Sequence, residues 1–244
     1  MPVPEPFQER NGQFTIALPG ARAAFTTRRG GVSQGAYTSL NLGFATADDP
    51  DHQDANRARL AELVGAPPAG WMHQVHGDRV DVLDDPAALG QRPEIDGRVT
   101  RLTGVALGAL GADCLTVAIA GGGAVAIAHA GWRGLAAGVL GRAVDRVREL
   151  ADDGAELHAA IGPGAGLCCY EVGPEVHAAF RERPQARRGN NLDLSAIAAA
   201  QLAGAGTDAV HAIGLCTICH PELFFSHRRD RGITGRQAGL AWLI

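Results

Sequence analysis

One cysteine and one histidine stand at opposite ends of the most apolar stretch of this chain. Cys114 comes directly before the apolar run 115–120, His129 comes directly after the run 124–128, and three glycines separate the runs. Short apolar runs bounded by glycines indicate two buried strands joined as a hairpin. That pairing places Cys114 beside His129, where a thiol and an imidazole can bind a metal or act as nucleophile and base. A buried cysteine and a hydrogen-bonded structural histidine would explain the pair equally well.

Three further segments carry residue types that could bind a ligand. Arg28 and Arg29 precede two glycines, and such a loop can hold an anion such as phosphate. His73 and His76 lie three residues apart before a Gly-Asp pair, so we expect a strand and turn in which only one of them faces a site. Arg228 and Arg229 follow two phenylalanines and could hold phosphate or a base. A solvated or salt-bridged turn is the alternative for both arginine segments.

The two C-terminal cysteines form a separate motif. Cys216, Cys219 and His220 match the pattern of c-type haem attachment. That chemistry takes place in exported proteins, and because we find no export signal we do not expect a haem here. A zinc knuckle from Cys216 and Cys219 would need a second pair of ligands, and the sequence has none spaced nearby. The serine nucleophile elbow, the P-loop and the dinucleotide-binding fingerprint are all missing.

Composition restricts the class of protein. The 244 residues are 46% hydrophobic and carry a net charge of −4 without a long basic run, which argues against nucleic acid as a partner. Five cysteines, two of them adjacent, make a poor disulfide framework. Because we find neither an apolar leader nor an uninterrupted apolar stretch of membrane-spanning length, we expect a soluble protein in a reducing, cytoplasmic setting.

The remaining elements must position these side chains. Apolar periodicity predicts four helices, at 54–64, 135–150, 175–181 and 194–202. It also predicts a first hairpin and several single strands, at 14–18, 23–27, 105–110, 157–161, 209–213, 223–225 and 238–244. The order shows no regular alternation of strand and helix. We therefore expect one α+β domain over residues 1–244, with mixed sheets flanked by helices.

Several segments together resemble one family. They are FTTRRGGVSQGAYTSLNLG, HQVHGDRV, GADCLTVAIA, VAIAHAGWRGLAAGVL, IGPGAGLCCYEVG, LDLSAIAAAQL and CTICHPELFFSHRRDRGITGRQAGLAWL. The set is similar to the YfiH-type laccase-domain proteins and covers the chain from about Phe25 onward. These proteins were once called multicopper polyphenol oxidases and are now read as purine nucleoside phosphorylases with adenosine deaminase activity. The resemblance implies their layered fold, which is related to that of bacterial toxin deamidases.

The resemblance also implies a metal site. Its ligands would be His76, Cys114 and His129, which would also be the catalytic residues, with zinc as the metal and copper as the alternative. The implied partners are phosphate and a purine nucleoside: adenosine, inosine, guanosine or methylthioadenosine. Leu167, Ala198 and His227 depart from the family pattern, which leaves substrate preference open.

From residue type and motif position we expect further substrate contacts. Arg28 is the first candidate for binding the anion, with Arg228 and Arg133 as the others, and Asn41 and Asp113 could contact ribose or base. Three alternatives remain open: a copper-dependent phenol oxidase, a metal-free Cys-His hydrolase, and a nucleoside-binding module with a structural zinc. The sequence indicates no oligomeric state.

Overall fold

Two six-stranded sheets and a small two-stranded ribbon make up the strands of this computed structural model, which describes residues 3–244. The first sheet contains, in spatial order, β1 (Gln8–Arg10), β2 (Gln13–Leu18), β3 (Ala21–Phe25), β14 (Gln237–Leu243), β7 (Ala106–Gly111) and β4 (Ala69–Trp71). The second contains β13 (Ala209–Ala212), β10 (His158–Ile161), β8 (Leu115–Gly121), β9 (Ala124–Ala130), β6 (Gly97–Thr100) and β5 (Val80–Leu83). The ribbon pairs β11 (Arg187–Arg188) with β12 (Asn191–Leu192).

Both large sheets are mixed. Three pairs are parallel, namely β4 with β7, β10 with β13, and β5 with β6, and the other neighbouring strands are antiparallel. The chain's last described strand, β14, lies in the interior of the first sheet between β3 and β7. The sheet that begins with β1 and β2 therefore depends on a strand from the other end of the sequence.

The hairpin predicted around the central glycines is present. β8 and β9 pair antiparallel, with Leu115 opposite Ala130 and Thr116 opposite His129. Gly122 and Gly123 form the turn at φ values of 56° and 72°, a region that favours glycine. Every residue of both strands is buried, which explains why their sequences are continuous apolar runs.

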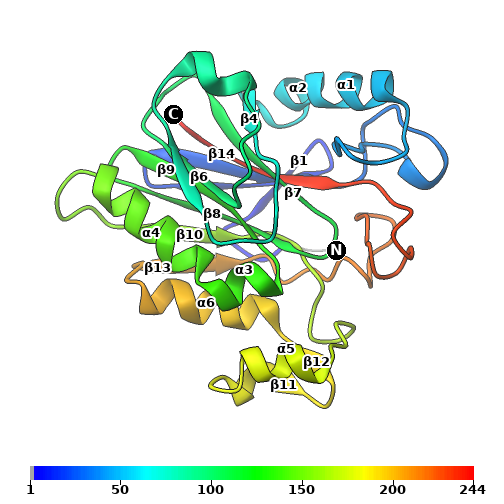
Figure 1. The fold of residues 1–244 in the computed structure, drawn as a ribbon. Helices are drawn as coiled ribbons and strands as arrows, with labels where there is room; N and C mark the ends of the chain where they lie inside the picture. The colour runs from blue at the N-terminus through cyan, green and yellow to red at the C-terminus, as the bar shows by residue number, and fades with distance from the viewer. Residues whose placement is uncertain (1–2) are drawn as a thin grey trace.

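The helices lie outside the two sheets, except that α5 (Pro174–Ala179) lies beside the β11–β12 ribbon, away from both sheets (Figure 1). The others are α1 (Pro50–Ala58), α2 (Leu60–Val64), α3 (Trp132–Ala137), α4 (Val139–Leu150) and α6 (Leu194–Gly204). Three short 3₁₀ turns complete the set, namely η1 (Gly35–Tyr37), η2 (Pro86–Gly90) and η3 (Pro184–Ala186). Figure 1 shows α4 and α6 on the outside of the second sheet and α1 and α2 at the opposite side of the molecule. No described helix combines the length and the apolarity needed to cross a membrane.

Three apolar cores lie between these layers. One core, which includes Ile119 and Val144, lies between the second sheet and the helices α4 and α6. A second, which includes Phe25 and Ile127, lies between the two sheets. The third includes Leu60 and packs α2 on the first sheet. The chain is thus α+β with mixed sheets flanked by helices, as expected.

Three predicted elements differ from the structure. The single helix expected at 54–64 begins earlier, at Pro50, and is divided at Arg59 into α1 and α2. The single helix expected at 135–150 is broken at Gly138, which adopts a φ of 91° and separates α3 from α4. The strand expected at 223–225 is a turn. Phe224 and Phe225 are fully buried, but the backbone of Phe225 exchanges hydrogen bonds with the Gln237 side chain, at 2.9 and 3.1 Å, instead of with a neighbouring strand. The apolar pattern at 223–225 therefore reflects the burial of these side chains and not a β-strand.

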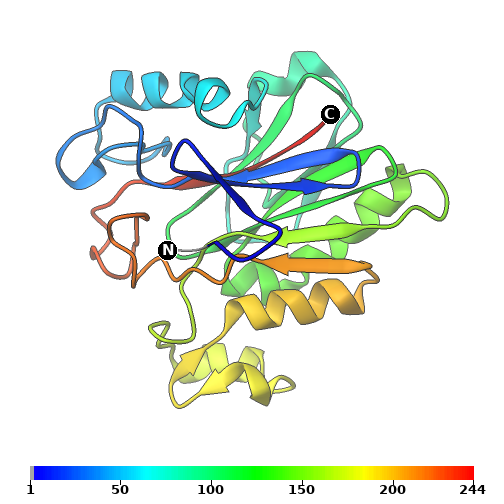
Figure 2. The ribbon, with the colours of Figure 1, turned by 180° about the vertical axis from the view of Figure 1, so that it is seen from behind.

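Long loops gather at one end of the sheets. The loop after β10 and the segment between β13 and β14 lie next to each other in both Figure 1 and Figure 2. A parallel bridge between Gly164 and Cys216 joins them. The residues expected to do chemistry lie on these loops and at the adjacent strand ends.

Candidate active site and metal centre

His76, Cys114 and His129 converge from three separate segments. One ligand atom from each lies within 4.8 Å of the other two. The Sγ of Cys114 lies 3.9 Å from Nε2 of His76, and the two imidazole rings are 4.9 Å apart at an angle of 80°. Ligands about 2.0–2.3 Å from a tetrahedral zinc are themselves roughly 3.6 Å apart, so the cluster is close to the size that one ion requires.

A buried carboxylate orients the histidine of β9. Asp96, at the end of the loop before β6, is fully buried, and its Oδ1 lies 2.8 Å from Nδ1 of His129. The Nδ1–H therefore donates to the carboxylate, so that in the neutral imidazole the lone pair is on Nε2, the nitrogen left to bind a metal ion. Burial raises the pKa of Asp96, but its hydrogen bonds to His129 and to backbone N–H groups hold that pKa below its usual range.

The same carboxylate fixes the loop that carries His76. Asp96 accepts hydrogen bonds from the backbone N–H groups of Val75, His76 and Gly77 at 3.1, 3.0 and 2.7 Å. His76 has a φ of 62°, which is unusual for a residue with a side chain. Asp113, next to Cys114, has a φ of 92°. Non-glycine residues held in this region cluster at functional sites, where the surrounding contacts over-determine the backbone.

Gly131 leaves room for the cluster. A Cβ at this position would lie 2.9 Å from the Sγ of Cys114 and 3.2 Å from Cδ2 of His76. Real Cβ atoms essentially never approach another heavy atom within 3.0 Å, and a contact of 3.2 Å is tighter than nine in ten. The glycine after β9 is therefore part of the reason that the three ligands can meet.

Charge within the cluster favours a thiolate beside an imidazolium when no metal is bound. Burial raises the pKa of Cys114, but the neighbouring His129 and His76 lower it to about 6. Burial lowers the pKa of His129, but Cys114 and Asp96 together raise it to about 9. A thiol that ionises this readily is prepared to bind a metal ion or to act as a nucleophile.

The cluster opens into a cavity of about 490 Å³, a volume typical of small-molecule sites. Its lining combines apolar, aromatic and basic groups with the cluster itself. The apolar and aromatic part includes Phe44, Met72, Leu110, Trp132 and Tyr170. A larger cavity of about 760 Å³ lies beside α5, but no group of metal ligands lines it, so we place the chemistry in the smaller one.

Four arginines line this cavity, namely Arg92, Arg133, Arg228 and Arg236. Three of them rest on an aromatic ring of the same lining. The guanidinium carbons of Arg92, Arg133 and Arg228 lie 3.6, 4.4 and 5.3 Å from the ring centroids of Phe44, Trp132 and Tyr170 respectively. Cation–π contacts hold these side chains near the cavity, which makes the site a basic pocket in a protein of net negative charge.

A family model described as multi-copper polyphenol oxidoreductase laccase matches residues 22–244. The chain belongs to this laccase-like YfiH family. Relatives from Xylella fastidiosa strain 9a5c and Streptomyces coelicolor, each 43% identical, are both named purine nucleoside phosphorylase. The alignments cover 93% and 92% of this chain and 94% and 96% of the relatives.

Solved structures of YfiH-family members share the fold. Bacillus licheniformis YfiH superposes with a TM-score of 0.90 at 30% identity, covering 98% of this chain and 100% of its own. Geobacillus stearothermophilus YlmD superposes with a TM-score of 0.88 at 34% identity, covering 98% and 99%. The family and the layered α+β fold expected from the sequence are thus confirmed.

Two of the substrate residues expected from the YfiH-family motifs lie elsewhere. Arg28 is not among the lining residues. Its guanidinium donates to the carbonyls of Thr38 and Pro221 at 2.6 and 3.0 Å and covers the Phe225 ring. Asn41 is fully buried outside the lining, and its amide donates to the Thr46 hydroxyl at 2.9 Å and to the Asp48 carboxylate at 2.8 Å. Both side chains hold loops together.

Asn41 also connects to the cavity through its carbonyl. Its Oδ1 accepts hydrogen bonds from the backbone N–H groups of Gly43 and Arg236 at 3.0 and 2.9 Å. This places Asn41 behind an arginine of the lining, so its contribution to the site is to position other residues.

The other three expected substrate residues do line the cavity. Arg133 and Arg228 are exposed and supply basic groups. Asp113 is buried, and its two carboxylate oxygens accept from the Thr217 hydroxyl at 2.6 Å and from the Arg228 N–H at 2.7 Å. Asp113 therefore positions the loop of Arg228 as well as bordering the cavity.

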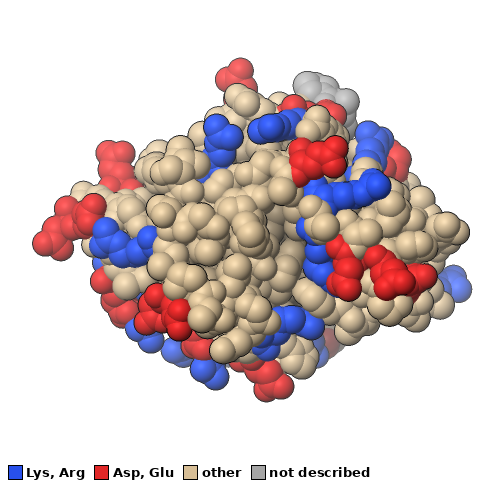
Figure 3. Space-filling model, turned by 90° about the horizontal axis from the view of Figure 1, so that it is seen from above, with Lys and Arg blue, Asp and Glu red and all other residues tan. Residues whose placement is uncertain are grey.

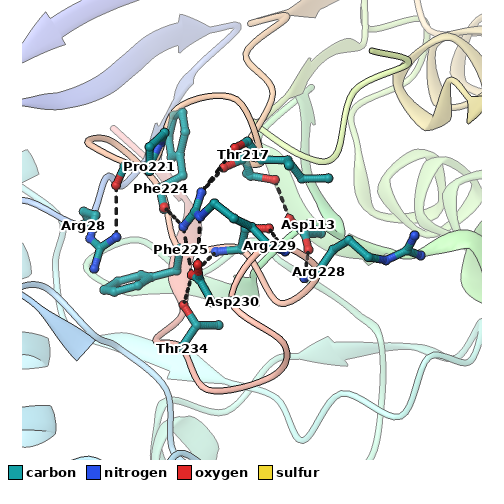
Figure 4. Close-up of polar contacts among 12 residues, drawn as sticks. Arg28, Asp113, Thr217, Pro221, Phe224, Phe225, Arg228, Arg229, Asp230 and Thr234 are labelled. Atoms are coloured by element: carbon teal, nitrogen blue, oxygen red, sulfur yellow. Dashed lines mark hydrogen bonds and ion pairs between the residues drawn. The ribbon is translucent and has the colours of Figure 1, made fainter. Parts of the chain in front are cut away.

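The two adjacent arginines of the C-terminal motif have different roles. In Figure 4, Arg229 points back into its own loop, whereas Arg228 extends away from it. Arg229 donates to Asp230 at 2.8 Å, to the Thr217 carbonyl at 2.7 Å and to the Phe224 carbonyl at 2.9 Å. Arg229 thus forms the salt-bridged turn considered from the sequence, whereas Arg228 lines the cavity and donates to the Glu171 carbonyl at 2.6 Å.

Sequence reasoning missed several residues of the lining and its support. Asp96 stands at the end of the polar segment GQRPEID and belongs to none of the motifs above, so the local sequence carried no signal for its role. Arg236, in the TGRQAG segment, is half-buried and bonds the described chain through only one guanidinium nitrogen, Nη1. Burial raises the pKa of Tyr170 to about 12, so its hydroxyl stays protonated and can donate to a ligand.

His73 and His76 separate as expected. Only His76 belongs to the ligand cluster. His73 is exposed and borders the same cavity, with its Nδ1 3.7 Å from a carboxylate oxygen of Glu94.

The face shown in Figure 3 carries basic and acidic side chains interspersed around a largely uncharged centre. That part of the described surface shows no continuous basic band of the kind that follows a nucleic-acid backbone.

The donor set fits a catalytic metal ion. Two imidazole nitrogens and one thiolate would hold a tetrahedral zinc with one position left for a reactant, and the hydrogen bond from His129 to Asp96 supplies the outer support that such sites use. The same His₂Cys set also occurs in blue-copper proteins, so the identity of the metal belongs to the proposal below.

Proposed function

We propose that this protein is a zinc-dependent purine nucleoside phosphorylase that also deaminates adenosine. The substrates would be adenosine, inosine, guanosine and methylthioadenosine, cleaved by phosphate to the free base and the pentose 1-phosphate. One observation carries the proposal, namely that the ligand cluster of His76, Cys114 and His129 opens into a cavity lined by four arginines and several aromatic rings. The names of the relatives from Xylella fastidiosa and Streptomyces coelicolor support the phosphorylase part of the proposal.

The chain would bind the two substrates with different parts of the cavity. Phosphate is a dianion near neutral pH, so the arginines of the lining supply its charge partners. Arg236 is the best placed because it is half-buried, whereas the other three arginines of the lining are exposed, and Nε and Nη2 of its guanidinium make no hydrogen bond to the described residues. The purine would pack on the apolar side of the lining, beside Met72 and Trp132, with the Tyr170 hydroxyl as a donor.

Phosphorolysis joins a phosphate oxygen to C1′ as the bond from C1′ to the purine nitrogen breaks. The purine departs with the electron pair of that bond and takes up a proton. Positive charge develops on the sugar, so a phosphate held against C1′ by fixed guanidinium groups stabilises the transition state and removes the entropic cost of encounter. Zinc held by His76, Cys114 and His129 would supply Lewis-acid polarisation and the activation of water that deamination of adenosine requires.

The test is release of hypoxanthine from inosine, followed with and without phosphate. The wild type should release base only when phosphate is present, and Cys114→Ala should lose both the activity and the zinc of this site. Adenosine separates the two reactions, because phosphorolysis yields adenine and deamination yields inosine and ammonia. Release of base that is independent of phosphate would contradict the proposal.

A metal-free Cys-His hydrolase is the second candidate, favoured by the low pKa of Cys114, about 6, beside His129. It predicts activity on amides that survives complete chelation and is lost on alkylation of Cys114. Zinc dependence of base release would exclude it.

The copper oxidase suggested by the family description has weaker support. A multicopper enzyme needs clusters of histidines. The described residues form two groups of three or more metal-ligand side chains, and the second group contains only cysteines. A nucleoside-binding module with structural zinc would be recognised by ligand-dependent thermal stabilisation without release of base.

A further inference from the structure

Four cysteines outside the active site lie together at the surface. Cys168 and Cys169 come from the turn after β10, and Cys216 and Cys219 come from the turn after β13. All four sulfur atoms lie within 4.8 Å of one another. The Sγ of Cys219 is 3.4 Å from that of Cys168 and 3.1 Å from that of Cys169. The sequence-based expectation that Cys216 and Cys219 lack a second ligand pair is therefore wrong.

Backbone pairing brings the two turns together. Gly164 and Cys216 form a parallel bridge, in which the N–H of Thr217 donates to the Gly164 carbonyl at 2.9 Å. Gly166 permits the close approach, because a Cβ there would lie 3.1 Å from the Cβ of Cys216 and 3.4 Å from the Sγ of Cys168. The arrangement is thus set by the main chain and not by the sulfur contacts alone.

We propose that Cys168, Cys169, Cys216 and Cys219 form a second metal site, a structural zinc site with four thiolate ligands. Thiolates about 2.3 Å from a tetrahedral zinc are roughly 3.8 Å apart. The two closest sulfur contacts, at 3.1 and 3.4 Å, are slightly shorter than that, and no sulfur of the four lies more than 4.8 Å from another, so the cluster is close to the size that one ion requires. Four soft thiolate donors favour zinc over hard cations. The Cys-x-x-Cys spacing of Cys216 and Cys219 is the usual spacing of one half of such a site.

Two further features fit a metal-thiolate site. The N–H of Gly166 points at the Sγ of Cys216 at 3.3 Å, and such hydrogen bonds orient and stabilise a ligating sulfur. Cys216 is buried at the base of the cluster, whereas Cys168 and Cys219 are exposed, which gives an ion a path from solvent. Cys219 approaches two other sulfurs within hydrogen-bonding distance, so the geometry selects no single disulfide pair.

The four cysteines lie next to residues that line or support the substrate cavity. Cys169 precedes Tyr170, which lines the substrate cavity. Cys216 precedes Thr217, whose hydroxyl donates to Asp113 at 2.6 Å and whose carbonyl accepts from Arg229 at 2.7 Å, as Figure 4 shows. A zinc ion here would join the two loops that support one wall of the cavity, and its loss would loosen that wall without touching His76 or His129.

The experiment counts zinc by elemental analysis in protein purified from medium containing zinc. The wild type should contain about two ions per chain, because each ligand group holds one. Cys114→Ser should retain only the four-cysteine zinc, Cys219→Ser should retain only the active-site zinc, and the double variant should contain none. The count does not depend on which substrate the enzyme uses, so it can fail or succeed independently of the proposed phosphorylase activity.

Three measurements keep the test decisive if a variant folds poorly. In the wild type, stepwise modification of thiols should release two zinc ions to a chromogenic chelator. In Cys114→Ser, replacement of zinc by cobalt(II) should give the strong visible and near-ultraviolet absorption of a tetrahedral tetrathiolate. Chelation should lower the Tm of Cys114→Ser but leave that of the double variant unchanged.

Several outcomes would overturn the proposal. They are one zinc per wild-type chain that Cys219→Ser does not change, iron or copper in place of zinc in Cys114→Ser, and a disulfide that lowers the mass of the unreduced chain by about two hydrogens.

Discussion

Gly131→Ala isolates the spatial requirement of the active-site cluster. The backbone at Gly131 has φ −73° and ψ 170°, which alanine adopts without strain. The added methyl group, however, would lie 2.9 Å from the Sγ of Cys114 and 3.2 Å from Cδ2 of His76. The substitution therefore acts on the ligands and not on the fold of the loop.

The size of the effect follows from these distances. Ordinary contacts of a Cβ begin at 3.4 Å, so the sulfur must retreat by at least about 0.5 Å. Metal sites hold their ligand distances to about 0.2 Å, and catalytic groups must stay within about 0.5 Å of the productive geometry. We expect zinc affinity to fall by about 10- to 100-fold, the range seen when groups that orient metal ligands are removed, with a loss of kcat/KM at limiting zinc.

Gly173→Ala is the matched control. Gly173 has the same position before α5 as Gly131 has before α3, with φ −75° and ψ 170°. The three atoms nearest to its Cβ would all belong to the carboxyl group of Glu175, which is exposed and can move away. Both variants should therefore share the modest cost of alanine at a helix start, at most about 1 kcal/mol. Competition with a chelator of known affinity measures zinc binding in each. Equal affinity in Gly131→Ala, Gly173→Ala and the wild type would refute the claim that the cluster has no spare room.

Three further substitutions test other parts of the site and its support. Asp96→Asn removes the carboxylate that orients His129 and accepts three N–H groups, so zinc affinity in chelator competition should fall by about 10- to 100-fold and urea unfolding should show a loss of about 2–3 kcal/mol. Arg236→Gln should raise the KM for phosphate by roughly tenfold in initial-rate assays while leaving the zinc content unchanged, since it removes one charged contact. Asp230→Asn should destabilise the chain by about 1 kcal/mol at pH 7, because Asp230 loses its pairing with Arg229. Burial opposes ionisation of Asp230, but the hydrogen bond from Arg229 lowers its pKa below the usual value, so the stabilisation is present above about pH 4 and is lost as the pH falls further. The stability difference between Asp230→Asn and wild type should accordingly disappear in urea unfolding at low pH; an equal difference at both pH values would contradict the assignment.

Local patterns predicted the parts of the fold that local interactions determine. The hairpin of β8 and β9 follows from two apolar runs and a glycine turn, and it placed Cys114 near His129 correctly. The insertion of β14 between β3 and β7 could not be read from the sequence, because strands far apart in the chain pair through burial and not through local spacing. The same limit hid the meeting of the two cysteine pairs, which depends on the bridge between Gly164 and Cys216.

Polar residues in the interior were the hardest to predict. A lone aspartate in a polar loop, such as Asp96, looks solvated, and only the tertiary structure shows that four hydrogen-bond donors surround it. Arg28 gave the opposite error, since its glycine-rich loop suggested an anion site. The side chain instead satisfies two backbone carbonyls and packs on Phe225. Residue type indicated what each group could bind, but not which partner was nearest.

The interior place of β14 has a consequence for how the protein is made. A ribosome completes the edges of β3 and β7 long before it delivers residues 237–243, so both edges wait without their hydrogen-bonding partner during elongation. Nascent chains that stall in this interval would expose unpaired strand edges that are prone to aggregate. Chaperones that shield such edges should bind these nascent chains preferentially. Folding yield in the cell would then depend on the time that translation needs for the segment between β7 and β14.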